Sequence, residues 1–189
     1  MSEPVYRLKD DPHSSHSVIL ARLGEGRGRK ALDVGAADGF LAERLTGQGW
    51  NVTALERDPA LAARAHGRCK EVVVADLEAA PPLLDGPFDA IVYGDVLEHL
   101  SDPRAALVAL DRTHLRFFTR RTLMAFLQSA GLAVAELRVT PVPLPLVVPP
   151  RWHGAGLRGL HDLSARIARL WPGGLAYQFV AVCRVEGGP

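Results

Sequence analysis

The chain has 189 residues, of which 48% are hydrophobic and 23% are charged, a length and balance that favour one folded domain and exclude a disordered chain or a coiled coil. Its two cysteines, Cys69 and Cys183, stand far apart, which excludes a disulfide framework and a structural zinc site and favours a reducing, cytoplasmic location. The net charge of +1 is divided unevenly: residues 1–110 hold 12 Lys and Arg against 17 Asp and Glu, whereas residues 111–189 hold 10 against 4. This uneven charge distribution can help the protein to discriminate between cationic and anionic ligands, although chance surface composition explains it equally well.

The first half of the chain alternates between strand-like and helix-like patterns. Short apolar runs predict four buried strands, over residues 31–35, 51–56, 71–76 and 88–95. Helical spacing, proline positions and terminal glycines predict four helices, over residues 16–23 (capped by Ser14 or Ser15), 40–45, 59–65 and 103–110. This alternation predicts an α/β fold with a doubly wound, mostly parallel sheet and helices on both faces.

Beyond residue 110 the pattern is less regular. We expect a helix over residues 119–129, a strand over 133–140, a helix over 160–171 and an antiparallel C-terminal strand over 177–185. The segment VTPVPLPLVVPP, residues 139–150, contains five prolines. This composition predicts an extended linker or lid.

The most informative stretch is ALDVGAADGFLAERL, residues 31–45, in which a strand enters a turn with Gly35 and Gly39 and then a helix. Such a turn lets a ligand approach the backbone closely, and the helix start supplies free N–H groups. A dinucleotide site needs glycines at positions 37 and 40, but the chain has Ala37 and Phe40. A nicotinamide-dependent oxidoreductase is therefore disfavoured.

The order acid-x-Gly-x-x-x-Gly from Asp33 to Gly39 resembles motif I of the class I S-adenosylmethionine-dependent methyltransferases, whose fold is Rossmann-like. Three later segments also resemble this family in order: the strand that ends at Glu56, the strand that ends in Asp76-Leu77, and GDVLEHLSDP at residues 94–103. The resemblance implies that S-adenosyl-L-methionine is the cofactor, with Glu56 on its ribose, Asp76 on its adenine amine and Gly94 and Asp95 on its methionine side. The cofactor-binding residues that it implies are Asp33, Gly35, Ala36, Ala37, Gly39, Glu56, Arg57, Asp76, Leu77, Gly94 and Asp95.

The chemistry of these residues agrees with the resemblance. The cofactor carries no phosphate, so it needs carboxylates for its hydroxyls and amine rather than a basic clamp, and the first half of the chain is acidic. The upstream segment HSSHSVIL resembles a helix that precedes motif I in some members, which would bring Ser14, His16 or Ser17 to the cofactor carboxylate. A plain helix cap explains the same residues equally well.

The resemblance is interrupted after Leu110, where a fifth strand and its loop are expected but residues 111–132 follow directly. Either the natural chain is shortened or a stretch is missing from the sequence. We expect a single methyltransferase domain over residues 1–189, with a cofactor-binding half at 1–110 and a C-terminal, substrate-side half at 111–189. The interruption also supports a second hypothesis, a non-catalytic cofactor-binding module with a degenerate substrate half.

Methyl transfer needs a general base only if the nucleophile arrives protonated. His99, just beyond the fourth strand, and His114 are the candidate catalytic residues, and a structural role explains each of them as well. A metal site like that of some small-RNA 3′-end methyltransferases is also suggested by four residues: Asp95, Glu98, His99 and His114. We expect no metal, because the additional RNA-recognition region is absent and helix capping explains the two acids.

The remaining features bear on partners. Binding of an anionic acceptor is one role that suits four arginines, Arg112, Arg116, Arg120 and Arg121. A solvent-exposed helix face explains the same residues. The helix over residues 160–171 has the composition of a membrane-surface helix, but packing on the sheet is the favoured interpretation. No basic bias or module motif indicates nucleic acid, and no segment indicates a secretory signal or an integral membrane span. We expect an enzyme that methylates a small-molecule or glycan-type acceptor; its oligomeric state is not determined by the sequence.

Overall fold

The computed structural model describes residues 11–79, 82, 84–100, 120–129, 131–171 and 177–185. These residues fall into two compact units: residues 20–100 form the first, and residues 11–19 with 120–185 form the second. Helix α1 (Ser15–Leu23) contributes to both. The prediction of a helix at this position is confirmed, and Ser14 caps it, since its hydroxyl accepts a hydrogen bond from the Ser17 N–H at 3.2 Å.

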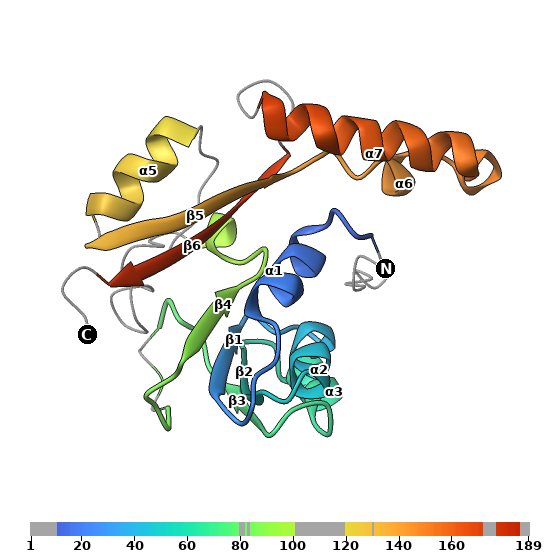
Figure 1. Cartoon of the computed structure of the whole chain (residues 1–189). Helices are drawn as coiled ribbons and strands as arrows, with labels where there is room; N and C mark the ends of the chain where they lie inside the picture. Colours follow the sequence, from blue (N-terminus) through green and yellow to red (C-terminus); the bar gives the residue numbers. More distant parts are fainter. Residues whose placement is uncertain are drawn as a thin grey trace. The chain divides into compact units, whose positions relative to one another are not determined.

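The first unit is built on a four-stranded parallel sheet with the order β3-β2-β1-β4 (Figure 1). Its strands are β1 (Lys30–Val34), β2 (Asn51–Glu56), β3 (Glu71–Val74) and β4 (Ala90–Tyr93). The last two are shorter than predicted, so that Asp76 and Leu77 lie in the turn after β3, and Gly94 and Asp95 lie in the turn after β4. A short 3-10 helix, η1 (Leu97–His99), follows.

Two helices cover β2, namely α2 (Phe40–Gly47) and α3 (Pro59–Ala65) (Figure 1). The central strands are almost entirely buried, which explains why their sequences are continuous apolar runs rather than alternating ones. Trp50 closes one end of this core. It is 3% exposed, its indole N–H donates to the Gly24 carbonyl at 2.9 Å, and the Arg29 guanidinium lies 4.3 Å from its ring centroid.

Helix α3 begins at Pro59 because Asp58 caps it. The Asp58 carboxylate accepts hydrogen bonds from the N–H groups of Ala60 at 2.7 Å and Leu61 at 3.3 Å. Asp58→Ala is expected to lower the free energy of unfolding by about 1 kcal/mol, the usual cost of losing such a cap. Urea denaturation measures this cost, and Asp58→Ser, which retains an acceptor, should restore most of it. Equal losses in the two variants would contradict the capping role.

The second unit pairs β5 (Leu132–Thr140) with β6 (Gln178–Val185) in an antiparallel two-stranded sheet. The expected antiparallel C-terminal strand is therefore present, but among the described strands it pairs with β5 and not with the parallel sheet. Helix α5 (Arg120–Ser129) packs on β5 with Leu123 and Leu127 buried, as its spacing predicts.

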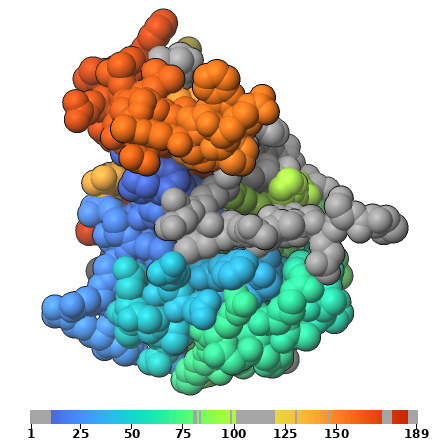
Figure 2. Space-filling view, turned by 90° about the vertical axis from the view of Figure 1, so that its right-hand side faces the viewer, coloured from blue at the N-terminus to red at the C-terminus, as the bar shows by residue number. Residues whose placement is uncertain are grey.

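The proline-rich segment is less extended than predicted. It contains the short helix α6 (Leu144–Val147) and the 3-10 helix η2 (Pro150–Trp152), since a proline in the first turn of a helix costs no hydrogen bond. Helix α7 (Ala155–Leu170) begins five residues earlier than expected and packs against β5 and α6. The atoms of this segment are drawn in orange in Figure 2. The predicted helix over residues 103–110 lies outside the described residues.

Candidate functional site

The carboxyl ends of the four parallel strands meet at one edge of the first unit's sheet. Val34 pairs with Leu55 of β2 and with Tyr93 of β4, and Glu56 pairs with Val74 of β3. Because the strands are parallel, the loops that follow them leave the sheet from this same edge, where open α/β sheets bind ligands. The sequence-predicted cofactor residues, apart from the strand residue Asp33, all lie at or just beyond it.

The loop between β1 and α2 makes a tight left-handed turn. Gly35, Ala37 and Gly39 have φ angles of 69°, 49° and 84°, and the N–H groups of Gly35 and Ala36 both donate to the Leu55 carbonyl, at 2.8 and 3.1 Å. A Cβ at Gly39 would lie only 2.9 Å from the Cβ of Ala65. Glycine is therefore required where α2 meets α3. Ala37 adopts the same left-handed region, which accounts for the usual glycine at this position in related motifs.

Glu56 holds this loop in place. Its side chain is buried, with the residue 7% exposed; Oε2 accepts a hydrogen bond from the Ala37 N–H at 2.8 Å and Oε1 accepts one from the Asp58 N–H at 2.9 Å. Each carboxylate oxygen can accept a second hydrogen bond. Glu56 therefore fixes the glycine loop to the end of β2 and can still receive a pair of ligand hydroxyls.

Two further carboxylates near the loop contain buried oxygens with no hydrogen-bond partner among the described residues: Asp33 Oδ2 and Asp38 Oδ1. Burial raises the pKa of Asp33 to about 7, opposed by a hydrogen bond from the Ala42 backbone and reinforced by the charge of Glu56. Unpartnered buried oxygens are costly. They fit a site that is completed by a ligand carrying hydrogen-bond donors or positive charge.

The other predicted cofactor residues lie along the same edge. Asp76 is exposed, and its Oδ1 accepts a hydrogen bond from the Glu78 N–H at 2.9 Å, while Leu77 is half-buried. Arg57 points into solvent. Gly94 and Asp95 are partly exposed after β4, and Asp95 has a φ of 56°. The structure thus brings residues from all four strand ends to one edge of the sheet. Glu56 ends β2, and Asp76 follows the adjacent strand β3.

The predicted catalytic histidines are only partly described. His99 lies in η1, is exposed, and donates its backbone N–H to the Val96 carbonyl at 3.0 Å. His114, Arg112, Arg116 and the side chain of Glu98 lie outside the described residues. Within the part of the chain that the structure describes, no group of three or more His, Cys, Asp or Glu residues is arranged to hold a metal ion.

Ser14 and Ser17, which the sequence offered as contacts for a cofactor carboxylate, are engaged locally. Ser14 caps α1, and the Ser17 hydroxyl donates to the Asp11 carbonyl at 2.7 Å. The structure therefore shows the helix-cap alternative for Ser14, and Ser17 ties the first turn of α1 to Asp11.

Sequence reasoning missed Asp38 and Val96 as residues of the site. A Cβ on Gly35 would overlap the Cγ2 atom of Val96, so Val96 packs directly over the glycine loop. Asp38 stands inside the loop motif, and its acidity was the available signal. Val96 stands in the GDVLEHLSDP segment, but the sequence does not predict its contact with Gly35, because that contact joins two loops 61 positions apart.

Comparison with known proteins agrees with this geometry. A family model described as a methyltransferase domain matches residues 32–114. The ubiquinone biosynthesis O-methyltransferase of Xylella fastidiosa (strain 9a5c) is 37% identical over 131 residues, which are 60% of this chain and 51% of that protein. The protein with the same description from Pectobacterium atrosepticum is 34% identical over 168 residues, covering 79% and 63%. The chain thus spans about half to two thirds of the length of these relatives.

Among solved structures, a TehB-like SAM-dependent methyltransferase from Corynebacterium glutamicum superposes with a TM-score of 0.55 at 23% identity. The superposition covers 69% of this chain and 78% of that one. At this identity the likeness supports the fold, which is the Rossmann-like one that the sequence predicted. Residues 32–114 therefore match a methyltransferase domain, and the first unit has the Rossmann-like fold of solved S-adenosylmethionine-dependent methyltransferases.

Proposed function

We propose that this protein is an S-adenosylmethionine-dependent O-methyltransferase that acts on a small hydroxylated molecule. The observation that carries the proposal is the glycine loop fixed to Glu56 at the carboxyl edge of the sheet. The curated relatives above are described as O-methyltransferases, which supports oxygen as the methylated atom. The proposed acceptors include glycan-type hydroxyls. We also propose a cytoplasmic location, which the cysteine usage favours.

The site residues fit the cofactor. The two oxygens of Glu56 would receive the ribose hydroxyls, Asp76 would accept from the adenine amine, and Gly94 and Asp95 would flank the methionine part. The unpartnered oxygens of Asp33 and Asp38 supply acceptors for positively polarised groups. When bound, S-adenosylmethionine supplies a methyl group activated by a positively charged sulfur.

The chain's own residues would contribute by orienting the reactants and by accepting a proton. Holding the cofactor loop rigid orients an in-line displacement, which accounts for much of the acceleration in such reactions. His99 or His114 would accept the proton of the acceptor hydroxyl. We assign the cofactor half to residues 1–110 and the acceptor half to residues 111–189, within one methyltransferase domain.

Glu56→Gln is the direct test of the cofactor site. We expect S-adenosylhomocysteine to bind the variant about 5- to 150-fold more weakly, because a charged hydrogen-bond acceptor contributes about 1–3 kcal/mol. Isothermal titration calorimetry measures the change. Glu71→Gln is the matched control, since Glu71 lies at the opposite end of β3 and should leave the affinity unchanged. Equal affinities of wild type and Glu56→Gln would remove Glu56 from the site.

One alternative has a specific observation in its favour. The interruption after Leu110 favours a cofactor-binding module without catalysis. Transfer of a labelled methyl group to any hydroxylated acceptor, lost in Gly35→Asp, would exclude the module. Tight S-adenosylhomocysteine binding without transfer to a panel of phenols and sugars would favour it.

A further inference from the structure

Helix α7 exposes its large apolar residues and buries its small ones. The exposed fractions of its outward apolar side chains are 56% for Leu160, 51% for Leu163, 37% for Ile167 and 86% for Leu170, and Trp171, just beyond the helix, is 66% exposed. The buried positions are His161, Ala165 and Ala168, at 4%, 2% and 0%. A helix that merely packs on a sheet buries its leucines. The packing on the sheet that the sequence favours is present, but it is made by the small residues, and the leucine side of α7 is left exposed.

These apolar residues form one stripe. At 100° per residue, positions 160, 163, 167 and 170 recur at spacings of three and four and lie on a single side of the helix. The stripe is about 15 Å long at a rise of 1.5 Å per residue. The buried small residues occupy a second sector and the charged residues a third.

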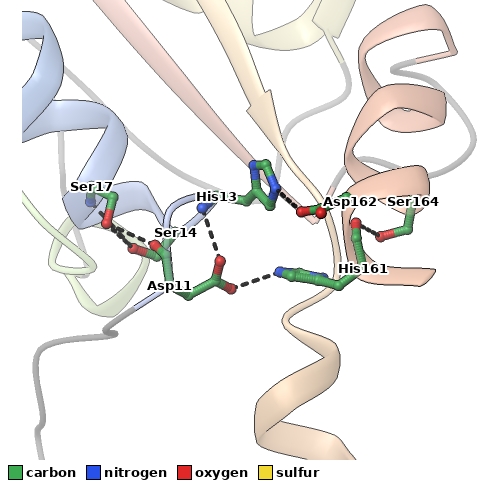
Figure 3. Close-up of polar contacts among 7 residues, drawn as sticks. All are labelled: Asp11, His13, Ser14, Ser17, His161, Asp162 and Ser164. Atoms are coloured by element: carbon green, nitrogen blue, oxygen red, sulfur yellow. Dashed lines mark hydrogen bonds and ion pairs between the residues drawn. The ribbon is translucent and has the colours of Figure 1, made fainter. Parts of the chain in front are cut away.

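Polar contacts fix the rotation of the helix about its axis (Figure 3). His161 Nε2 lies 2.8 Å from Asp11 Oδ2, and His13 Nε2 lies 2.9 Å from Asp162 Oδ1. Asp11 is held in turn by the His13 N–H, which donates to its Oδ1 at 2.8 Å. Since His161 is buried on this side, the leucine stripe faces away from these contacts.

The charges on α7 and in the turn before it are mostly positive. Between Pro150 and Trp171 the chain has four arginines, Arg151, Arg158, Arg166 and Arg169, and one acid, Asp162. All four arginines are exposed, as is Trp152 at 67%. An apolar stripe that ends next to Trp171 and is bordered by Arg166, on a helix whose other charges are mostly arginines, matches the composition of helices that lie in a membrane interface.

We propose that α7 docks, lying flat, on an anionic lipid surface, with its leucine stripe in the apolar boundary and its arginines at the headgroups. The helix has 16 residues and a length of about 24 Å, and within the described part of the chain no helix is long and apolar enough to cross a bilayer. A second copy of the chain fits this surface less well, because it would bring another set of arginines alongside the first. The proposal does not depend on the methyltransferase activity.

Vesicle flotation with the full chain tests the proposal. We expect the protein to float with phosphatidylcholine vesicles that contain phosphatidylglycerol, and at least about tenfold less with phosphatidylcholine alone or in high salt. Leu163→Gln with Leu170→Gln should weaken binding at least about tenfold while leaving the thermal unfolding midpoint unchanged, since both side chains are exposed. Arg166→Gln with Arg169→Gln should reduce the preference for the anionic lipid.

Val74→Gln is the matched control, because Val74 is 52% exposed but belongs to the first unit. It should bind vesicles like the wild type. The proposal is overturned if the wild type does not float with anionic vesicles, or if the double leucine variant floats equally well. It is also overturned if sedimentation velocity shows a wild-type dimer that the leucine variant abolishes, without any vesicle binding. Flotation is independent of methyl transfer, so failure here leaves the proposed function standing.

Discussion

Gly35→Ala is expected to lower the free energy of unfolding by about 2–5 kcal/mol. The φ of 69° at Gly35 costs an alanine about 1–2 kcal/mol, and the new Cβ would overlap Val96 Cγ2, at a typical overpacking cost of about 1–3 kcal/mol. The Val96 side chain is short and branched, so it can move its Cγ2 aside only by turning about χ1 into a less favoured rotamer or by moving the backbone. Urea denaturation of the two proteins measures the difference.

Gly67→Ala separates the two causes in this prediction. Gly67 has a φ of 84°, but a Cβ there would meet nothing within 4 Å. The Gly67 variant should therefore show only the backbone cost of about 1–2 kcal/mol. Val96→Ala in the Gly35→Ala background should recover part of the loss, as a double-mutant cycle would show. If Gly35→Ala and Gly67→Ala cost the same, the loop does not pack on Val96 as described.

The free energy of unfolding of the wild type is expected to fall as the pH rises from about 4 to about 7, and Asp33→Asn is expected to remove this fall. The folded pKa of Asp33 is about 7 because the carboxyl is buried, against 3.8 for the ordinary side chain. Between these values the folded chain binds a proton that the unfolded chain has released, so stability falls as pH rises and is constant above pH 7. A difference of this size corresponds to something on the order of 4 kcal/mol. Asparagine, which stays neutral, carries no such penalty.

The measurement is the free energy of unfolding of wild type and Asp33→Asn at several pH values from 4 to 8. The difference between the two curves should grow with pH and level off near pH 7. Glu56→Gln removes a negative charge that raises the pKa of Asp33, so it should move this step to lower pH without removing it. Parallel curves for wild type and Asp33→Asn would show that Asp33 is ionised in the folded protein throughout this range.

The sequence by itself determined the α/β class, the strands of the parallel sheet and the loop that begins at Gly35. It could do so because these depend on short-range patterns: apolar runs for buried strands, and glycines where the backbone turns left-handed. The placing of Glu56 beside this loop also followed, since the ends of parallel strands meet at one edge.

Contacts between distant segments decided the rest. The raised pKa of Asp33 depends on burial from every side, and the tight fit at Gly35 depends on Val96 from another loop. The pairing of β6 with β5 depends on long-range hydrogen bonds. The amphipathic pattern of residues 160–171 predicted a helix correctly, but not which sector it would bury. Tertiary contacts, among them the packing of α7 on β5 and the contact of His161 with Asp11, 150 residues away, turned the small residues inward and left the leucines exposed.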